Sequence, residues 1–321
     1  MRSLGLALLL AGIVIGQGLA QANQPTSPAG RAASPSSTAS DKVGSARPDL
    51  TPDANGNLSQ EQMRQLFRVV TENDMRNDRL LRDYTYTERD VENKLNSQGE
   101  VKSTETRTYD VMELYGEQVQ RLITKDDKPL SAKDAAKEDA KIQKLIDKRK
   151  NESPEDRKKR EAKEEKEREN DRRFVTEIAD AYNFKLVGTE SLDGREAWVI
   201  DGEPRPGFDP QMKYANILPK FHGRVWIDKD DLQLAKMDVE CLDTVSWGLF
   251  LARFHKGSRF MLEQTRVNNE VWLPRHVTAE IGVRLVLLKN DNVDLDQTYS
   301  DYKKFRTSAK IISVGKVQSP K

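Results

Sequence analysis

The sequence of 321 residues is poor in the side chains that build disulfides and metal sites. It has one cysteine, Cys241, and three histidines, His222, His255 and His276. A single cysteine cannot form a disulfide within the chain, so the fold must depend on its hydrophobic core alone. The histidines are far apart, and none has a partner at the i+4 spacing of a helical zinc motif. We therefore expect no metal site and no cofactor.

Catalytic motifs are missing too. The chain has no Gly-Lys-Ser/Thr phosphate loop, no Rossmann glycine fingerprint and no Gly-x-Ser-x-Gly nucleophile elbow. The acidic run Asp228–Asp231 lacks the central glycine and distal glutamate of an EF-hand loop, so a hairpin turn is the better interpretation. We expect no catalytic residues and no enzyme activity. A hydrolase with its site at residues 202–220 is a hypothesis that nothing in the sequence supports.

The charges nearly cancel, although charged residues make up 33% of the chain. The formal net charge is +1. Long-range attraction to nucleic acid or to anionic lipid therefore cannot be the main interaction, and no nucleic-acid partner is expected.

Long apolar runs are rare, and the one at the N-terminus indicates export. Arg2 precedes an apolar run from Leu4 to Ile15, and the small residues Ala20 and Ala22 follow. This is the pattern of a signal peptide over residues 1–22, cleaved after Ala22. The run is shorter than the ~20 residues needed to span a bilayer. We expect a periplasmic protein with no transmembrane segment in its mature chain.

Residues 23–58 are rich in Ser, Pro, Ala and Gly and predict a disordered linker. Order should begin at Ser59, which forms a capping box with Gln62 and opens an amphipathic helix to about Leu81. Strands follow over residues 84–91 and 100–109, with a hairpin turn at residues 96–99. Residues 110–123 continue as a third strand, kinked near Gly116. Polar residues on one face of these strands predict a sheet that is wet on that side.

Residues 131–173 form a highly charged insertion. Their composition predicts two helices, from Ala132 to Lys150 and from Pro154 to Tyr182, with Ser153 as N-cap of the second. One interpretation makes this hairpin an arm that binds an envelope protein partner. The other makes it a solvated pair of helices stabilised by i to i+4 ion pairs, which the mixed charge favours.

The region from Phe221 to Arg306 predicts an antiparallel sheet, because apolar and polar residues alternate between short Asp/Asn turns. Two further strands precede it, and a long loop covers residues 202–220. Ser246 and Gly257 predict a short helix between Trp247 and His255. Pro274 implies an edge or a break in its strand. Residues 59–306 thus form one domain, interrupted by residues 131–173 and followed by a flexible tail, 307–321.

The predicted fold is α+β, with a strongly curved antiparallel sheet, a half-open barrel, covered by helices. Its apolar concave face must be covered by these helices or by a ligand. The residues that the alternation places on that face are Val225, Ile227, Met237, Val239, Phe260, Leu262, Val277 and Ile281, with Phe250 and Phe254 as a plug or wall.

Three motifs carry a resemblance to a known family. They are Gly223-Arg-Val-Trp-Ile-Asp228, Trp272-Leu-Pro274 and the run from Tyr299 to Phe305. Together with the signal peptide, the N-terminal helix and the hairpin, they make the chain similar to exported bacterial proteins of the LolA-like superfamily. That family includes outer-membrane lipoprotein carriers and lipoprotein-sorting relatives. The resemblance implies the half-open barrel and a non-enzymatic carrier of a lipid, an acyl chain or a lipidated protein. The alternative is a regulatory or scaffolding module that binds a protein through the charged hairpin or the sheet rim.

Overall fold

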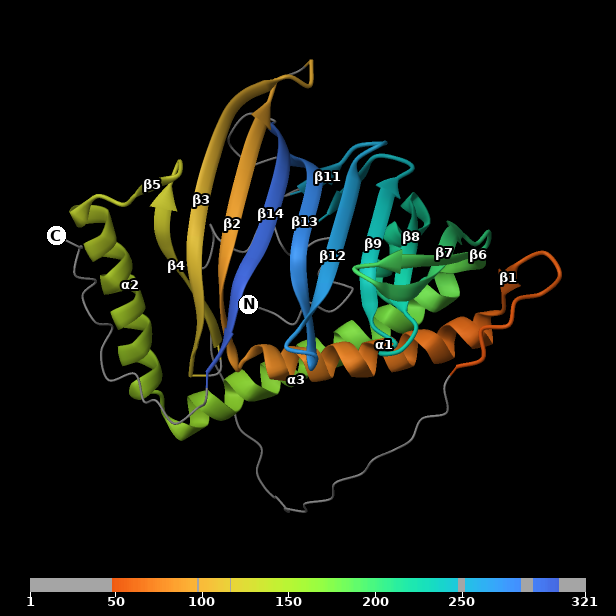
Figure 1. Ribbon diagram of the computed structural model, residues 1–321, viewed down its shortest axis with the longest axis horizontal. Coiled ribbons are helices and arrows are strands. Elements are labelled where there is room, and N and C mark those ends of the chain that lie inside the picture. The colour runs from red at the N-terminus through yellow and green to blue at the C-terminus, as the bar shows by residue number, and fades with distance from the viewer. Residues whose placement is uncertain (1–47, 97, 116, 248–251, 284–290, 306–321) are drawn as a thin grey trace.

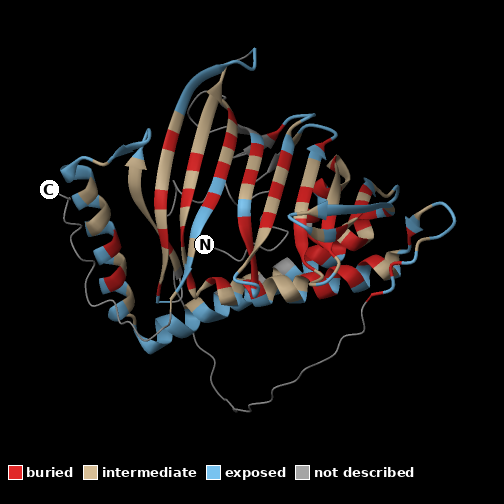
Figure 2. Cartoon of the chain, in the orientation of Figure 1, coloured by how far each residue is buried: buried red, intermediate tan, exposed pale blue. Residues whose placement is uncertain are grey.

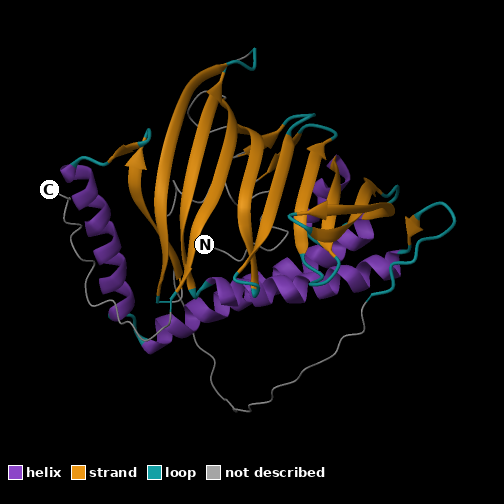
Figure 3. Ribbon diagram, viewed as in Figure 1, coloured by secondary structure: helices purple, strands orange, loops and turns teal. Residues whose placement is uncertain are grey.

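The computed structural model describes residues 48–305, except residues 97, 116, 248–251 and 284–290. The described part is a large antiparallel sheet that does not close into a barrel, with long helices beneath it and beside it (Figures 1 and 3). The predicted α+β class and curved open sheet are confirmed.

The helices are α1 (Gln60–Leu81), α2 (Ala132–Lys150), α3 (Pro154–Ala181) and the 3-10 helix η1 (Lys213–Lys220). The strands are β1 (Asn57–Leu58), β2 (Tyr84–Leu95), β3 (Val101–Leu114), β4 (Glu117–Lys125), β5 (Lys128–Pro129), β6 (Tyr182–Leu192), β7 (Arg195–Pro204), β8 (Phe221–Asp228), β9 (Leu234–Cys241), β10 (Val245–Trp247), β11 (Ala252–Phe254), β12 (Arg259–Val267), β13 (Val271–Val283) and β14 (Asp291–Lys304).

The strand order brings the last strand of the chain beside one of the first. Across the sheet the order is β1-β6-β7-β8-β9-β12-β13-β14-β2-β3-β4-β5, and neighbours are antiparallel. β14 pairs with β2, where Tyr299 lies opposite Glu88. The strands β2–β4 therefore extend the sheet formed by the second half of the chain.

Helix α1 begins where the capping box predicts. The Ser59 hydroxyl accepts a hydrogen bond from the Gln62 N–H at 3.2 Å, and the Gln62 side chain accepts one from the Ser59 N–H at 2.8 Å. The apolar stripe of α1 is buried, with Met63 and Leu66 fully inaccessible. Its contacts with α3 and β13 place this helix over the inner face of the sheet.

The two helices of the charged insertion also lie where the sequence predicts. Ser153 caps α3 and Pro154 occupies its first turn. α2 packs its few apolar residues, Ile142 and Ile146, against Leu114 and Val119 of β3 and β4 in a small separate core. The first half of α3 is largely exposed, as the pale blue segment in Figure 2 shows.

The predicted helix between Trp247 and His255 is wrong at its described residues, and residues 248–251 lie outside the described part of the chain. Trp247 ends strand β10 (Val245–Trp247), and Ala252–Phe254 form β11, which pairs with β10 and with β13. Pairing with β13 gives hydrogen-bond partners to backbone N–H and C=O groups that would lack them at the ends of a short helix. This pairing outweighs the local capping signals. Phe254 packs edge-on against Phe221, with ring centroids 5.9 Å apart.

Three other boundaries differ from the sequence prediction. The single kinked strand over residues 110–123 is instead a hairpin, because β3 ends at Leu114 and β4 begins at Glu117; Gly116 itself lies outside the described residues. The loop over residues 202–220 contains the end of β7 and helix η1. Arg275 lies at a register shift of the β12–β13 ladder, next to Pro274, so the expected break is a bulge inside the sheet.

Candidate functional site

An apolar pocket lies at one end of the inner face of the sheet. It has a volume of about 70 Å³ and lies between α1, the end of α3, η1 and strands β6 to β9. His222 and Tyr182 are its only lining residues with a polar side chain, and the Tyr182 hydroxyl donates to the Leu218 carbonyl at 2.7 Å. The lining residues are Phe67, Ile178, Tyr182, Phe184, Ile200, Gly202, Leu218, His222, Gly223, Val225, Met237 and Val239.

Two paired glycines lie in the wall of this pocket. Gly202 on β7 lies opposite Gly223 on β8. A Cβ atom on Gly202 would lie 3.2 Å from the Phe184 ring, and one on Gly223 would lie 2.8 Å from the Asp238 carbonyl oxygen. Side chains at these positions would force their neighbours apart, so the close packing here requires glycine.

The structure places three of the ten predicted site residues in the pocket wall: Val225, Met237 and Val239. Five others belong to the same core cluster but lie outside the pocket: Ile227, Phe254, Phe260, Leu262 and Val277. Phe250 and the side chain of Ile281 lie outside the described residues. The alternation therefore identified inward-facing residues of β8 and β9. It missed the walls formed by α1, α3, β6 and η1, whose apolar residues are recognisable in the sequence but not assignable to a pocket.

The register of the sheet divides its inner face into an apolar part and a polar part. One row of directly opposed residues runs across β7, β8, β9, β12 and β13 as Ile200, Val225, Met237, Leu262 and Val277. The same row continues across β14, β2, β3 and β4 as Gln297, Asp90, Arg107 and Lys125. The change from aliphatic to polar side chains thus occurs at β14.

The polar part contains a buried carboxyl pair, Glu88 and Asp90, which are 2% and 8% exposed. The Gln120 amide donates to Glu88 at 2.9 Å, and the Gln297 amide donates to Asp90 at 2.9 Å. Burial, and then the neighbouring Asp90, raises the pKa of Glu88 to about 8; burial also raises the pKa of Asp90. Glu88 and Asp90 lie on the inner face of β2, which belongs to the core, so the wet side predicted for these strands is not their side.

Charged groups nearer the rim neutralise one another. Arg107 lies 2.7 Å from Glu105 and 3.8 Å from Glu92, and Lys125 lies 2.9 Å from Glu105. These side chains are a quarter to a half exposed. The inner face therefore ends in a mixed polar rim at β2–β4.

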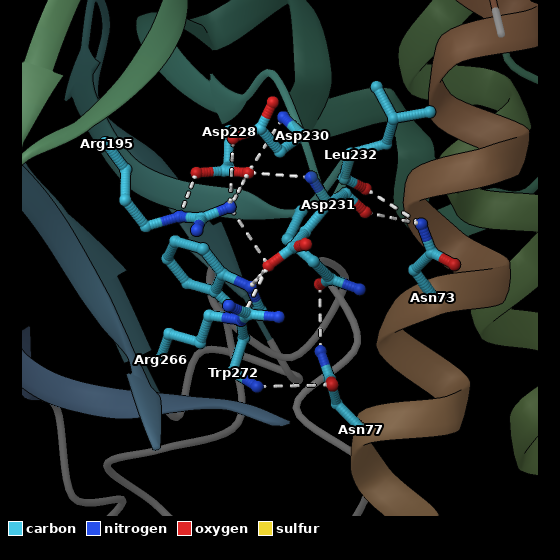
Figure 4. Close-up of polar contacts among 10 residues, drawn as sticks. Asn73, Asn77, Arg195, Asp228, Asp230, Asp231, Leu232, Arg266 and Trp272 are labelled. Carbon is cyan, nitrogen blue, oxygen red and sulfur yellow. Dashed lines mark hydrogen bonds and ion pairs between the residues drawn. The ribbon is translucent and has the colours of Figure 1, made fainter. Parts of the chain in front are cut away.

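A second polar network fixes α1 to the sheet (Figure 4). Asp228, 1% exposed, accepts two hydrogen bonds of 2.7 Å from Arg195 and two from the N–H groups of Asp230 and Asp231. The Asp231 carboxylate in turn accepts from the Trp272 indole at 2.9 Å.

From α1, the Asn73 amide donates to the carbonyls of Asp231 and Leu232 at 3.0 Å, and the Asn77 amide donates to Gln233 at 2.9 Å. The β8–β9 turn therefore supports the C-terminal half of α1. This explains the acidic run at residues 228–231 as structural.

Two of the described histidines have carboxylate partners, and the described histidines do not gather into a metal site. His222 lies 3.2 Å from Glu203, and His276 lies 3.0 Å from Asp296, so each has a carboxylate partner. Within the described ranges, no three histidine, cysteine or acidic side chains gather into a potential metal site. Among the same residues, no helix combines the length and apolar character that crossing a membrane requires.

Comparison with known proteins yields low-scoring structural neighbours. A scan against protein-family models and a search of curated proteins match nothing. The chain is similar to an outer membrane lipoprotein-sorting protein domain from Vibrio parahaemolyticus (11% identity, 78% of this chain and 95% of that chain, TM-score 0.32). It is also similar to a DUF1329 family protein from Desulfovibrio piger (12%, 78% and 95%, TM-score 0.28). A third is a LolA superfamily protein from Nitrosomonas europaea (10%, 78% and 97%, TM-score 0.28). These neighbours include the superfamily that the sequence resembles. At such scores the likeness carries no inference about ligand or partner.

Proposed function

We propose that this protein is an exported, non-enzymatic binding protein that takes a lipid, an acyl chain or a lipidated protein against the inner face of its curved sheet. The observation that carries the proposal is the uninterrupted apolar row from Ile200 to Val277, which ends in the pocket between α1, α3 and η1. An aliphatic chain is the ligand that gains most from such a surface, because burial of apolar area is favourable at ~25 cal/mol per Å².

The pocket volume sets a condition on this function. About 70 Å³ is less than half of the ~150 Å³ apolar cavity that accommodates benzene. The pocket is therefore too small for an aliphatic chain in the present state, and a chain enters by displacing Phe67 of α1, Ile178 of α3 or Leu218 of η1, which line it.

The test is native mass spectrometry of the protein purified from the periplasm of its own cells. We expect a fraction of the protein to carry a lipid mass that organic extraction removes. Protein free of lipid in every preparation, which also fails to bind added fatty acid, would contradict the proposal.

The charged hairpin favours a second, independent function in binding an envelope protein. The first half of α3 is polar on all sides and largely exposed, which is unusual for a helix that serves only to cover a core. Deleting residues 132–166 should then abolish capture of the partner and spare lipid binding. Partner capture that survives the deletion would exclude this role.

A further inference from the structure

The inner face of the sheet is divided in a way that specifies its ligand further. Resting on the proposed function, we propose that the ligand is an amphiphile lying across the strands. Its apolar chain covers β8, β9, β12 and β13, and its polar head lies over β2 and β3. The proposal is carried by the register of the strands, which fixes which side chains share this face.

The apolar half of the inner face, which would hold the alkyl chain, consists of two adjacent rows of residues without a polar interruption. The first contains Val225, Met237, Leu262 and Val277, each directly opposite the next. The second contains Val239, Phe260, Ala279 and Leu295, again each opposite the next. No charged or hydrogen-bonding side chain interrupts either row, so an alkyl chain along them would leave no buried polar group without a partner.

The polar half of the face begins at β14 in the first row and one strand later, at β2, in the second. The first row passes from Val277 to Gln297 and Asp90, and the second passes from Leu295 to Glu92 and Glu105. Arg107, opposite Asp90, has a side chain 35% exposed, and that of Glu92 is 26% exposed. Gln297 and Asp90, at the end of the first apolar row, are buried, so the accessible donors and acceptors of both charges are on β2 and β3, at Glu92 and Arg107. An alkyl chain laid there would break their hydrogen bonds, whereas a polar head could replace them.

The dimensions agree with a membrane lipid. From Val225 on β8 to Val277 on β13 there are three strand spacings, about 14 Å at ~4.8 Å each. Half of a hydrocarbon core of ~30 Å, the depth that one lipid chain occupies, is about 15 Å. A chain of one leaflet's depth that starts at the polar boundary therefore ends over β8, beside the pocket.

Photo-crosslinking tests this orientation with two forms of one palmitoyl lysophospholipid, one with a diazirine at the chain end and the other with a diazirine on the head group. We expect the chain-end label on peptides of β8 and β9 and the head label on peptides of β2 and β3. Reversed labelling, or the same distribution for both forms, would overturn the orientation while leaving lipid binding intact. Labelling that excess unlabelled lipid does not compete on any strand would contradict the proposed function itself.

A matched pair of variants tests the head position. Arg107→Leu changes the inner face of β3, whereas Arg89→Leu changes an arginine of β2 that pairs with Asp127 at 3.0 Å on the opposite face. We expect Arg107→Leu to lower head-group labelling of β2–β3 by about tenfold, the loss typical of a hydrogen bond to a charged group, and Arg89→Leu to leave it unchanged. Equal labelling in the two variants would overturn the placement of the head on this rim.

Discussion

Glu88 makes the stability of the protein depend on pH. The pKa of its carboxyl is about 8 in the folded protein against an ordinary value of 4.5, so the folded chain binds more protons between these values. The stability that Glu88 contributes should be fully present below about pH 4.5 and should be lost as pH rises through 8, by up to ~1.4 kcal/mol per pH unit. Urea unfolding between pH 5 and pH 9 measures this slope.

Several titratable and polar groups face Glu88, so a variant must show that the slope of unfolding free energy against pH comes from the Glu88 carboxyl. They are Asp90 and Tyr86 on β2, Gln297, Tyr299 and Tyr302 on β14, Tyr109 and Arg107 on β3, and Gln120 on β4. Glu88→Gln keeps the hydrogen-bonding shape and should flatten the slope, and the partly exposed Glu92→Gln should not. Parallel slopes in the wild type and Glu88→Gln would show that the carboxyl does not titrate as described.

Asp228 is a buried member of the polar network that joins the β8–β9 turn to α1. Asp228→Ala leaves Arg195 without its bidentate partner and two turn N–H groups without an acceptor, so we expect a loss of about 3–5 kcal/mol of unfolding free energy. Asp127→Ala, which breaks the exposed pair with Arg89, should cost less than about 1 kcal/mol. Similar losses in both variants, measured by urea unfolding, would contradict a special role for Asp228.

Among the secondary-structure elements, α1 contributes to the main core and the start of α3 does not. Removing the cap by Ser59→Ala should lower the unfolding free energy by ~1 kcal/mol, because α1 unfolds together with the core. Ser153→Ala removes a similar cap from α3, whose first turns are exposed, so the main transition should change by less than about 0.5 kcal/mol. Thermal unfolding followed by circular dichroism compares the two. A larger effect at Ser153 would place the insertion in the cooperative core.

The accuracy of the sequence predictions varied with how local each signal is. The caps at Ser59 and Ser153 depend on residues within one turn and were confirmed. The residues after Ser246 carry equally local helix signals, yet residues 252–254 form strand β11, because they pair with β13 about thirty residues later. The burial of Glu88 was also not predicted from the sequence. That burial depends on a long-range contact, because the strand paired with β2 beside Glu88 is β14, from the other end of the chain.

At the scale of the whole molecule, the alternation of apolar residues gave the inner face but not the pocket. The pocket is assembled from seven elements, and Phe67 of α1 and Val239 of β9 meet there only because the sheet curves under the helix. No periodicity in the sequence reports such long-range contacts. The change from apolar to polar residues at β14 cannot be predicted from the sequence for the same reason. It depends on the pairing of Gln297 with Asp90, which are far apart in the chain.

Binding of a fluorescent fatty acid to the wild type and two variants tests the central claim most directly. Val225→Phe adds an aromatic ring to the pocket wall, whereas Val187→Phe makes the same change at a residue that is 50% exposed. The account predicts saturable binding to the wild type and Val187→Phe, and affinity about tenfold or more lower for Val225→Phe, with the thermal midpoint showing that this variant stays folded. Equal binding by all three proteins, or no saturable binding to the wild type, would contradict it.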